Sequence, residues 1–147
     1  MATIAQPIAL SKPTTTAASA PIVVLGRVLF SLIFLMTALS HFSSQTVAFA
    51  ASQGVPLASI AVPLSGIIAV LGGLSILLGY RAKLGAWLIV LFLVGVTPMM
   101  HRFWTVTDPM MHMMQMVMFM KNVSMLGGAL LISQCGTGPW SLDKQSA

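Results

Sequence analysis

Four long apolar segments alternate with short polar stretches along the chain. The segments run from about 21 to 42, 56 to 80, 84 to 100 and 108 to 132. A hydrocarbon core about 30 Å thick takes roughly 20 helical residues to cross, which is close to the length of each segment. Backbone N–H and C=O groups cannot stay unpaired in lipid, so each segment is expected to be a helix. The pattern predicts an all-α integral membrane protein built as a four-transmembrane-helix bundle.

Prolines and one aspartate mark several helix boundaries. Asp108 and Pro109 provide an N-cap residue followed by proline at the first helical position. Pro63 is expected to bend the second segment or to end a short entry turn, and Pro98 to mark the fraying end of the third. Residues 43–55, which link the first two segments, are polar but uncharged.

Glycine is frequent in the second and fourth segments. Small residues let helix backbones approach closely in lipid, where association has no hydrophobic drive. We therefore expect packing positions at Gly66, Gly72, Gly73, Gly79, Gly127 and Gly128.

The same pattern divides the chain into three parts. Residues 1–20 are rich in Ala, Thr and Ser and are predicted to form a flexible N-terminal tail. They do not make a convincing signal peptide, because the apolar run that follows is too long. Residues 21–133 form the predicted four-helix domain, and residues 134–147 form a short C-terminal tail.

Composition also indicates a membrane protein. Of the 147 residues, 57% are hydrophobic and only 6% are charged, whereas a soluble domain carries about 25% charged residues. The seven Lys and Arg residues are scattered, so the chain has no basic footprint for nucleic acid. A single cysteine, Cys135, excludes an intramolecular disulfide and a CxxC redox pair, and it is expected to be a small buried residue.

The basic residues predict how the bundle is oriented. With four spans, both ends of the chain lie on the same side of the membrane. The basic residues of the loops and tails lie on that side as well, except Arg102, which lies on the opposite side. Because cytoplasmic loops carry an excess of Lys and Arg, both termini are expected in the cytoplasm. Three of these residues are predicted to anchor the cytoplasmic side at the headgroups and anionic lipid, namely Arg27, Arg81 and Lys83.

Lys121 lies near the middle of the fourth segment, at the depth of the bilayer centre. A cation there costs about 2.5–3.5 kcal/mol on insertion scales, so Lys121 and Asn122 form a candidate intramembrane polar site. The two acidic residues, Asp108 and Asp143, both lie far from mid-membrane. Three interpretations stay open. In one of them the lysine is deprotonated, because desolvation disfavours the charged form of a lysine. The other two keep its charge. The lysine either snorkels or bonds to backbone carbonyls, or it faces a polar cavity that holds an anion, a quinone carbonyl or a partner's carboxylate.

A second candidate site gathers at the predicted outer face. His41 ends the first segment, His101 and Arg102 end the third, and His112 lies one turn into the fourth, with Trp104 between. Three neutral imidazoles at one level can bind a transition metal, and the cluster is also a candidate ligand or quinone site. The spacing of these histidines is not a recognised ligand pattern, and interfacial histidines that hydrogen-bond loops are commoner.

Methionine is concentrated at the start of the fourth segment, where it fills seven of the eleven positions from 110 to 120. Thioethers select Cu(I), which makes His112, Met113 and Met116 weak candidates for a copper site. These methionines point all round the helix, so most of them cannot converge on one ion. Flexible packing against neighbouring helices or lipid is the simpler interpretation, and no metal site is assigned.

Short motifs follow one another along most of the chain. They are Gly26-Arg27, Gly72-Gly73-Leu74, Leu77-Leu78-Gly79-Tyr80-Arg81, His101-Arg102-Phe103-Trp104, Phe119-Met120-Lys121-Asn122 ahead of Gly127-Gly128, and a final run from Gly136 to Asp143. Their order and spacing over about residues 22–143 resemble the DoxX family of small bacterial four-span membrane proteins. The resemblance implies a location in the bacterial inner membrane and a fold more firmly than a reaction. Some members resemble membrane subunits of redox systems such as thiosulfate:quinone oxidoreductase, and others are associated with oxidative-stress complexes.

The chain departs from that family at one position. DoxX members commonly carry a glutamate three residues before the paired glycines of the second span, where this chain has Ala69. The resemblance implies that this glutamate and the lysine at position 121 compensate one another across the bundle. Any family function that needs the carboxylate is therefore in doubt.

These observations favour an accessory or structural subunit of a membrane redox complex, quinone-linked or related to oxidative stress, that is not catalytic on its own. The chain has no nucleophile–base pair, phosphate loop, haem motif or dithiol. The expected partners are the lipid bilayer and other membrane subunits, and quinone is the cofactor considered. One alternative is a component that itself forms a quinone pocket around Lys121, His101 and Trp104. Another is a small copper-handling or transport protein.

Overall fold

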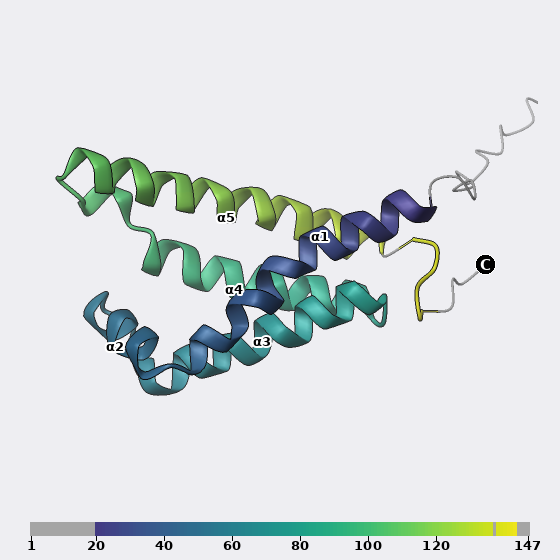
Figure 1. Ribbon diagram of the computed structural model, residues 1–147, viewed down its shortest axis with the longest axis horizontal. Coiled ribbons are helices and arrows are strands. Elements are labelled where there is room, and N and C mark those ends of the chain that lie inside the picture. The colour runs from purple at the N-terminus through teal and green to yellow at the C-terminus, as the bar shows by residue number, and fades with distance from the viewer. Residues whose placement is uncertain (1–19, 137, 144–147) are drawn as a thin grey trace, which may run out of the picture.

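Four long helices dominate the molecule (Figure 1). The computed structural model describes residues 20–136 and 138–143, and this part of the chain contains helices but no strand. The long helices are α1 (Ala20–Ala38), α3 (Ala58–Leu78), α4 (Ala82–Met100) and α5 (Pro109–Cys135). A short helix, α2 (Ser44–Ser52), and two single 3-10 turns, η2 (Leu39–Phe42) and η3 (Phe103–Thr105), complete the elements.

The four long helices have the length and composition of membrane spans. Together with the 3-10 turns that continue two of them, the candidate spans are Ala20–Phe42, Ala58–Leu78, Ala82–Thr105 and Pro109–Cys135. Large apolar side chains on their outer surfaces are exposed, as expected for surfaces that face lipid. The predicted all-α, four-span architecture is confirmed.

Helices α3 and α4 form the centre of the packing. Helix α4 lies between α3 and α5, and α1 packs across α3 (Figure 1). The core contains buried side chains of all four long helices, among them Phe34, Ile76, Ile89 and Ala129.

Helices α3 and α4 pack closely at two glycines. A Cβ added to Gly72 would lie 2.9 Å from the carbonyl oxygen of Gly85, and one added to Gly85 would lie 3.0 Å from the carbonyl oxygen of Gly72. The predicted packing role is thus confirmed for Gly72. Gly85, which it contacts, is not among the glycines predicted to pack. Gly127, by contrast, faces open space, so the packing role expected of it is wrong.

Several local predictions need correction. Helix α3 continues through Pro63, and the link over residues 43–55 contains α2. Ser43 caps this short helix, because its hydroxyl accepts a hydrogen bond of 3.2 Å from the Thr46 amide. Cys135 is exposed at the end of α5, so its predicted burial is wrong.

The C-terminal segment, residues 138–143, packs against the turn between α3 and α4. The Asp143 carboxylate accepts hydrogen bonds from the backbone amides of Arg81 (2.8 Å) and Ala82 (3.3 Å), which begin α4. The Asp143 amide donates to the carbonyl of Gly79 at 2.7 Å. This part of the predicted C-terminal tail therefore belongs to the fold. Of the predicted N-terminal tail over residues 1–20, Ala20 begins α1 and residues 1–19 lie outside the described residues.

Arg27 is not the lipid anchor that the sequence suggests. Its side chain is only 6% exposed, and its Nη2 donates to the carbonyl of Trp140 at 2.8 Å. The guanidinium thus joins α1 to the C-terminal segment. Arg81 and Lys83 are exposed at the same end of the bundle, in keeping with anchoring. The cytoplasmic placement of this end stays a prediction.

Candidate functional site

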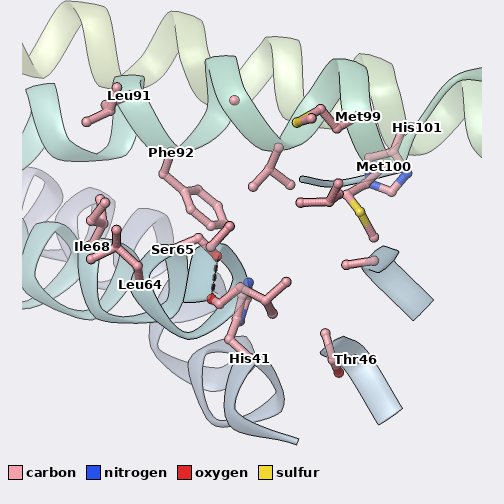
Figure 2. A pocket seen from close by; sticks show the side chains of 16 residues that line it. His41, Thr46, Leu64, Ser65, Ile68, Leu91, Phe92, Met99, Met100 and His101 are labelled. Atoms are coloured by element: carbon pink, nitrogen blue, oxygen red, sulfur yellow. Dashed lines mark hydrogen bonds between the residues drawn. The ribbon is translucent and has the colours of Figure 1, made fainter. Parts of the chain in front are cut away.

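A cavity of about 370 Å³ lies at the end of the bundle away from the C-terminal segment. Its walls come from η2, α2, α3 and α4, and most of the lining side chains are apolar (Figure 2). The volume falls within the range of small-molecule sites, about 300–1,000 Å³. Four side chains bring polar groups to this lining, namely His41, Thr46, Ser65 and His101.

His41 is held by contacts on three sides. Its Cβ lies so close to Gly66 that a methyl group there would be only 2.7 Å away, so a glycine is needed for η2 to pack on α3. The ring meets Phe92 edge-on at a centroid distance of 5.8 Å. Its Nδ1 lies 3.1 Å from the carbonyl oxygen of Thr37. Because a carbonyl only accepts, Nδ1 carries the proton and donates.

His101 lies on the opposite wall, where α4 ends (Figure 2). Its amide donates to the carbonyl of Thr97 at 3.1 Å, and its Nδ1 donates to Oε1 of Gln115 on α5 at 2.9 Å. In a neutral imidazole whose Nδ1 donates, Nε2 is an acceptor. Neither His41 nor His101 uses Nε2 in a hydrogen bond within the described ranges.

Helix α2 closes one side of the cavity. Ala50 on α2 packs with Ala58 and Val62 of α3 in a small second core. Arg102 reaches across from the start of η3 and donates from Nη2 to the carbonyl of Gln53, at the end of α2. Arg102 therefore holds α2 in place and does not contribute to a histidine cluster.

The remaining members of the predicted outer-face cluster lie elsewhere. Trp104 packs on Phe119, with ring centroids 5.9 Å apart. His112 meets Phe103 edge-on at 5.6 Å, and its Nδ1 lies 3.3 Å from the carbonyl of Val106. The predicted cluster is thus two sites: a cavity with two histidines, and an aromatic group on η3 and α5.

The predicted polar site at positions 121 and 122 is also divided. Asn122 is buried, with 7% of its surface exposed, whereas Lys121 is exposed on the outer surface of α5. Ala69, the position of the family glutamate, is buried in the core. A residue in the core and one on the outer surface of α5 cannot form a pair across the bundle, so that expectation is wrong.

The structure gives no support for a histidine-based metal centre. Among the described residues, no group of three or more His, Cys, Asp or Glu side chains is placed to hold a metal ion. Met113 and Met116 are exposed on α5, while the ring of His112 turns towards Phe103.

Sequence reasoning missed much of the cavity wall. Thr46 belongs to the undetected helix α2, and Ser65, Phe92 and Gly95 lie within apolar runs that show no sign of a cavity. The one available signal was the approach of His41 and His101 to the same end of the bundle.

The fold and the cavity define a class: a four-span integral membrane protein with a small apolar site near one end of the bundle. The chain belongs to the SURF4 family, whose model matches residues 11–146. Among curated proteins it is similar to the inner membrane protein YphA of Escherichia coli strain K12. The two are 28% identical over 100 residues, which cover 68% of this chain and 71% of YphA. No solved structure matches the chain.

The family match corrects the resemblance drawn from the short motifs. The chain matches SURF4 and not DoxX, so the assignment to DoxX is wrong. Small residues such as paired glycines are a general feature of helix packing in lipid, so they do not identify a family. The similarity to YphA supports an inner-membrane protein, and the sidedness of the termini stays a prediction.

Proposed function

We propose that this chain is an accessory membrane subunit that binds a quinol, a hydroxylated aromatic ring with an apolar tail, in the cavity beside His41 and His101. The observation that carries the proposal is that both imidazoles use Nδ1 in a hydrogen bond within the protein. Each commits its Nδ1–H inside the protein, so each ring offers Nε2 as an acceptor in its neutral form. A quinol hydroxyl donates to such a nitrogen, whereas a quinone carbonyl cannot.

The walls of the cavity suit the rest of such a ligand. Phe92 provides an aromatic edge beside His41. Leu64 and Leu91 line the cavity and are also more than half exposed on the outer surface of the helices. An apolar tail therefore has a path from the cavity into the bilayer. A few polar groups in an apolar cavity are the usual composition of a small-molecule site.

Binding of a short-chain quinol to the purified protein in lipid nanodiscs tests the proposal. His41→Leu removes one acceptor and should weaken binding by about tenfold, the size of one neutral hydrogen bond. Gly95→Leu should abolish binding, because Gly95 lines the cavity and a side chain there meets no neighbouring atom within 4 Å of its Cβ. The variant is thus expected to fill the cavity without disturbing the helices.

His112→Leu is the matched control, since His112 also uses Nδ1 towards a backbone carbonyl but lies outside the cavity. It should bind the quinol as the unmodified protein does. Unchanged binding by Gly95→Leu would show that the ligand sits elsewhere. Equal affinity for the quinol and the oxidised quinone would contradict the acceptor role of the histidines.

A second candidate function is copper binding, because the same cavity brings Met99 and Met100 beside the two histidines. Thioether and imidazole ligands together favour Cu(I). Copper analysis of protein loaded with Cu(I) and washed checks this candidate. Bound copper that is lost in Met100→Leu but retained in Met113→Leu, outside the cavity, would favour copper over a quinol. No bound copper in the unmodified protein would rule the candidate out.

A further inference from the structure

Lys121 places a positive charge on the lipid-facing side of α5. It lies twelve residues after Pro109 and fourteen before Cys135, about 18–21 Å from either end of the helix. Four methylene groups cover only a fraction of that distance, so snorkelling does not bring the ammonium group to the headgroups. Its one hydrogen bond is to the Sδ atom of Met118, at 3.3 Å, and a thioether is a weak acceptor.

Neither acidic side chain of this protein lies near the lysine. The sequence has two acidic residues, Asp108 and Asp143. Asp108 caps α5 by accepting from the Met111 amide at 2.8 Å, and Asp143 caps α4. Both serve as helix caps near the ends of spans, so neither aspartate supplies a counter-charge for Lys121.

The surface of α5 beside Lys121 is open to contact with a second helix. Helix α5 packs on α4 through a different face, which carries the buried residues Asn122 and Ala129. One turn beyond Lys121, Ser124 is exposed on a neighbouring part of the helix surface. Small residues at such positions allow close backbone approach in lipid, and polar side chains there form hydrogen bonds between helices.

We infer that this face of α5 binds a transmembrane helix of another protein that carries an Asp or Glu near the middle of its span. A second copy of this chain does not fit, because it would bring lysine against lysine and has no acid at that depth. Ionisable groups inside a membrane pair with one another, which makes an acidic helix the complementary partner. The inference rests on the accessory role proposed above and names the partner's chemistry; it does not depend on the cavity.

Energy transfer in vesicles of neutral phosphatidylcholine tests this inference with the full chain. The donor dye is attached to Cys135, the single cysteine, which is exposed at the end of the same helix. The acceptor is carried by a synthetic Leu/Ala transmembrane helix with one central Glu, Gln or Lys. The unmodified protein should bind the Glu helix at least about tenfold more tightly than the Gln helix.

Charge reversal provides the decisive comparison. Lys121→Met should remove the preference for the Glu helix, and Lys121→Glu should transfer it to the Lys helix. Lys83→Met, at the start of α4, should leave the preference unchanged. Equal binding of the Glu and Gln helices, or a preference that survives in Lys121→Met, would overturn the inference. So would self-association of the unmodified protein that depends on Lys121.

Quinol binding by the cavity and helix binding by α5 are separate measurements on separate variants. Gly95→Leu should lose the quinol and keep the preference for the Glu helix, and Lys121→Met should do the reverse. Each proposal can therefore fail in its own measurement whether or not the other proposal holds.

Discussion

Gly85→Ala should be among the most destabilising single substitutions in this protein, with a loss of about 1–3 kcal/mol, the usual cost of overpacking. The added methyl group would lie 2.5 Å from the Cβ of Ser75 and 3.0 Å from the carbonyl oxygen of Gly72. The second of these is backbone, which cannot turn away. Helices α3 and α4 would have to separate, and α4 is also the main support of α5.

The displaced serine adds to the cost. The Ser75 hydroxyl donates to the carbonyl of Tyr80 at 2.6 Å and so closes the turn between α3 and α4. A methyl group on Gly85 pushes Ser75 out of this position. Thermal unfolding in mild detergent measures the effect as a lower midpoint temperature.

Two variants make this result specific. Gly127→Ala is the control, since Gly127 is also within a helix but has open space around it, and its replacement should be neutral or slightly stabilising. Ser75→Gly in the Gly85→Ala background should recover part of the lost stability, because it makes room for the methyl group. A double variant no more stable than Gly85→Ala would contradict the proposed contact, since contacting residues are expected to be non-additive.

The membrane spans could be predicted from the sequence because the surrounding lipid determines their structure. Hydrophobic runs of this length have one stable form in lipid, and Asp108 followed by Pro109 marked the start of α5 correctly, with the Asp108 carboxylate 2.8 Å from the Met111 amide. Helix α2 escaped prediction because its nine residues mix Ala, Ser and Phe without a long apolar run. Its stability comes from packing of Ala50 on α3 and from the cap at Ser43, both of which are tertiary or local contacts.

The position of the candidate site residues along each span could be predicted from the sequence, but the face of the helix on which they lie could not. Position along a span places Lys121 at mid-membrane, yet the rotation of α5 decides whether it faces the core or the lipid. That rotation is set by the packing of Ala129 and Asn122 against the rest of the bundle. Likewise, His41, His101 and His112 do reach one end of the molecule. The turn at Phe103 then separates His112 from the cavity, which no spacing rule anticipates.

Gly79→Ala should release the C-terminal segment from the bundle, for two reasons that add. Gly79 has φ +67°, where a residue with a side chain is strained by about 1–2 kcal/mol. In addition, its new methyl group would lie 2.5 Å from Nη1 of Arg27 and 2.9 Å from the Cα of Ser141. The second atom is backbone of the docked segment, so the segment has to move away from the turn.

Hydrogen exchange of the segment measures this release directly. The amides of Leu142 and Asp143 donate to the carbonyls of Leu78 and Gly79 at 3.2 and 2.7 Å, so both should be protected from exchange in the unmodified protein. In Gly79→Ala their exchange should be faster by about tenfold or more, the factor that corresponds to 1.4 kcal/mol. The unfolding midpoint should fall as well, because Asp143 no longer caps α4.

Gly54→Ala separates the steric contact from the backbone strain. Gly54 has φ +81° and nothing within 4 Å of an added Cβ, so its replacement carries the strain alone. It should lower stability modestly and leave the exchange of Leu142 and Asp143 unchanged. If Gly79→Ala also left the exchange of Leu142 and Asp143 unchanged, contact with Gly79 would not hold the segment at the turn. The hydrogen bond from Arg27 to Trp140 would then not suffice to show that Arg27 joins α1 to the segment. Faster exchange in Gly79→Ala but not in Gly54→Ala would show that close packing at Gly79 holds the C-terminal segment against the turn.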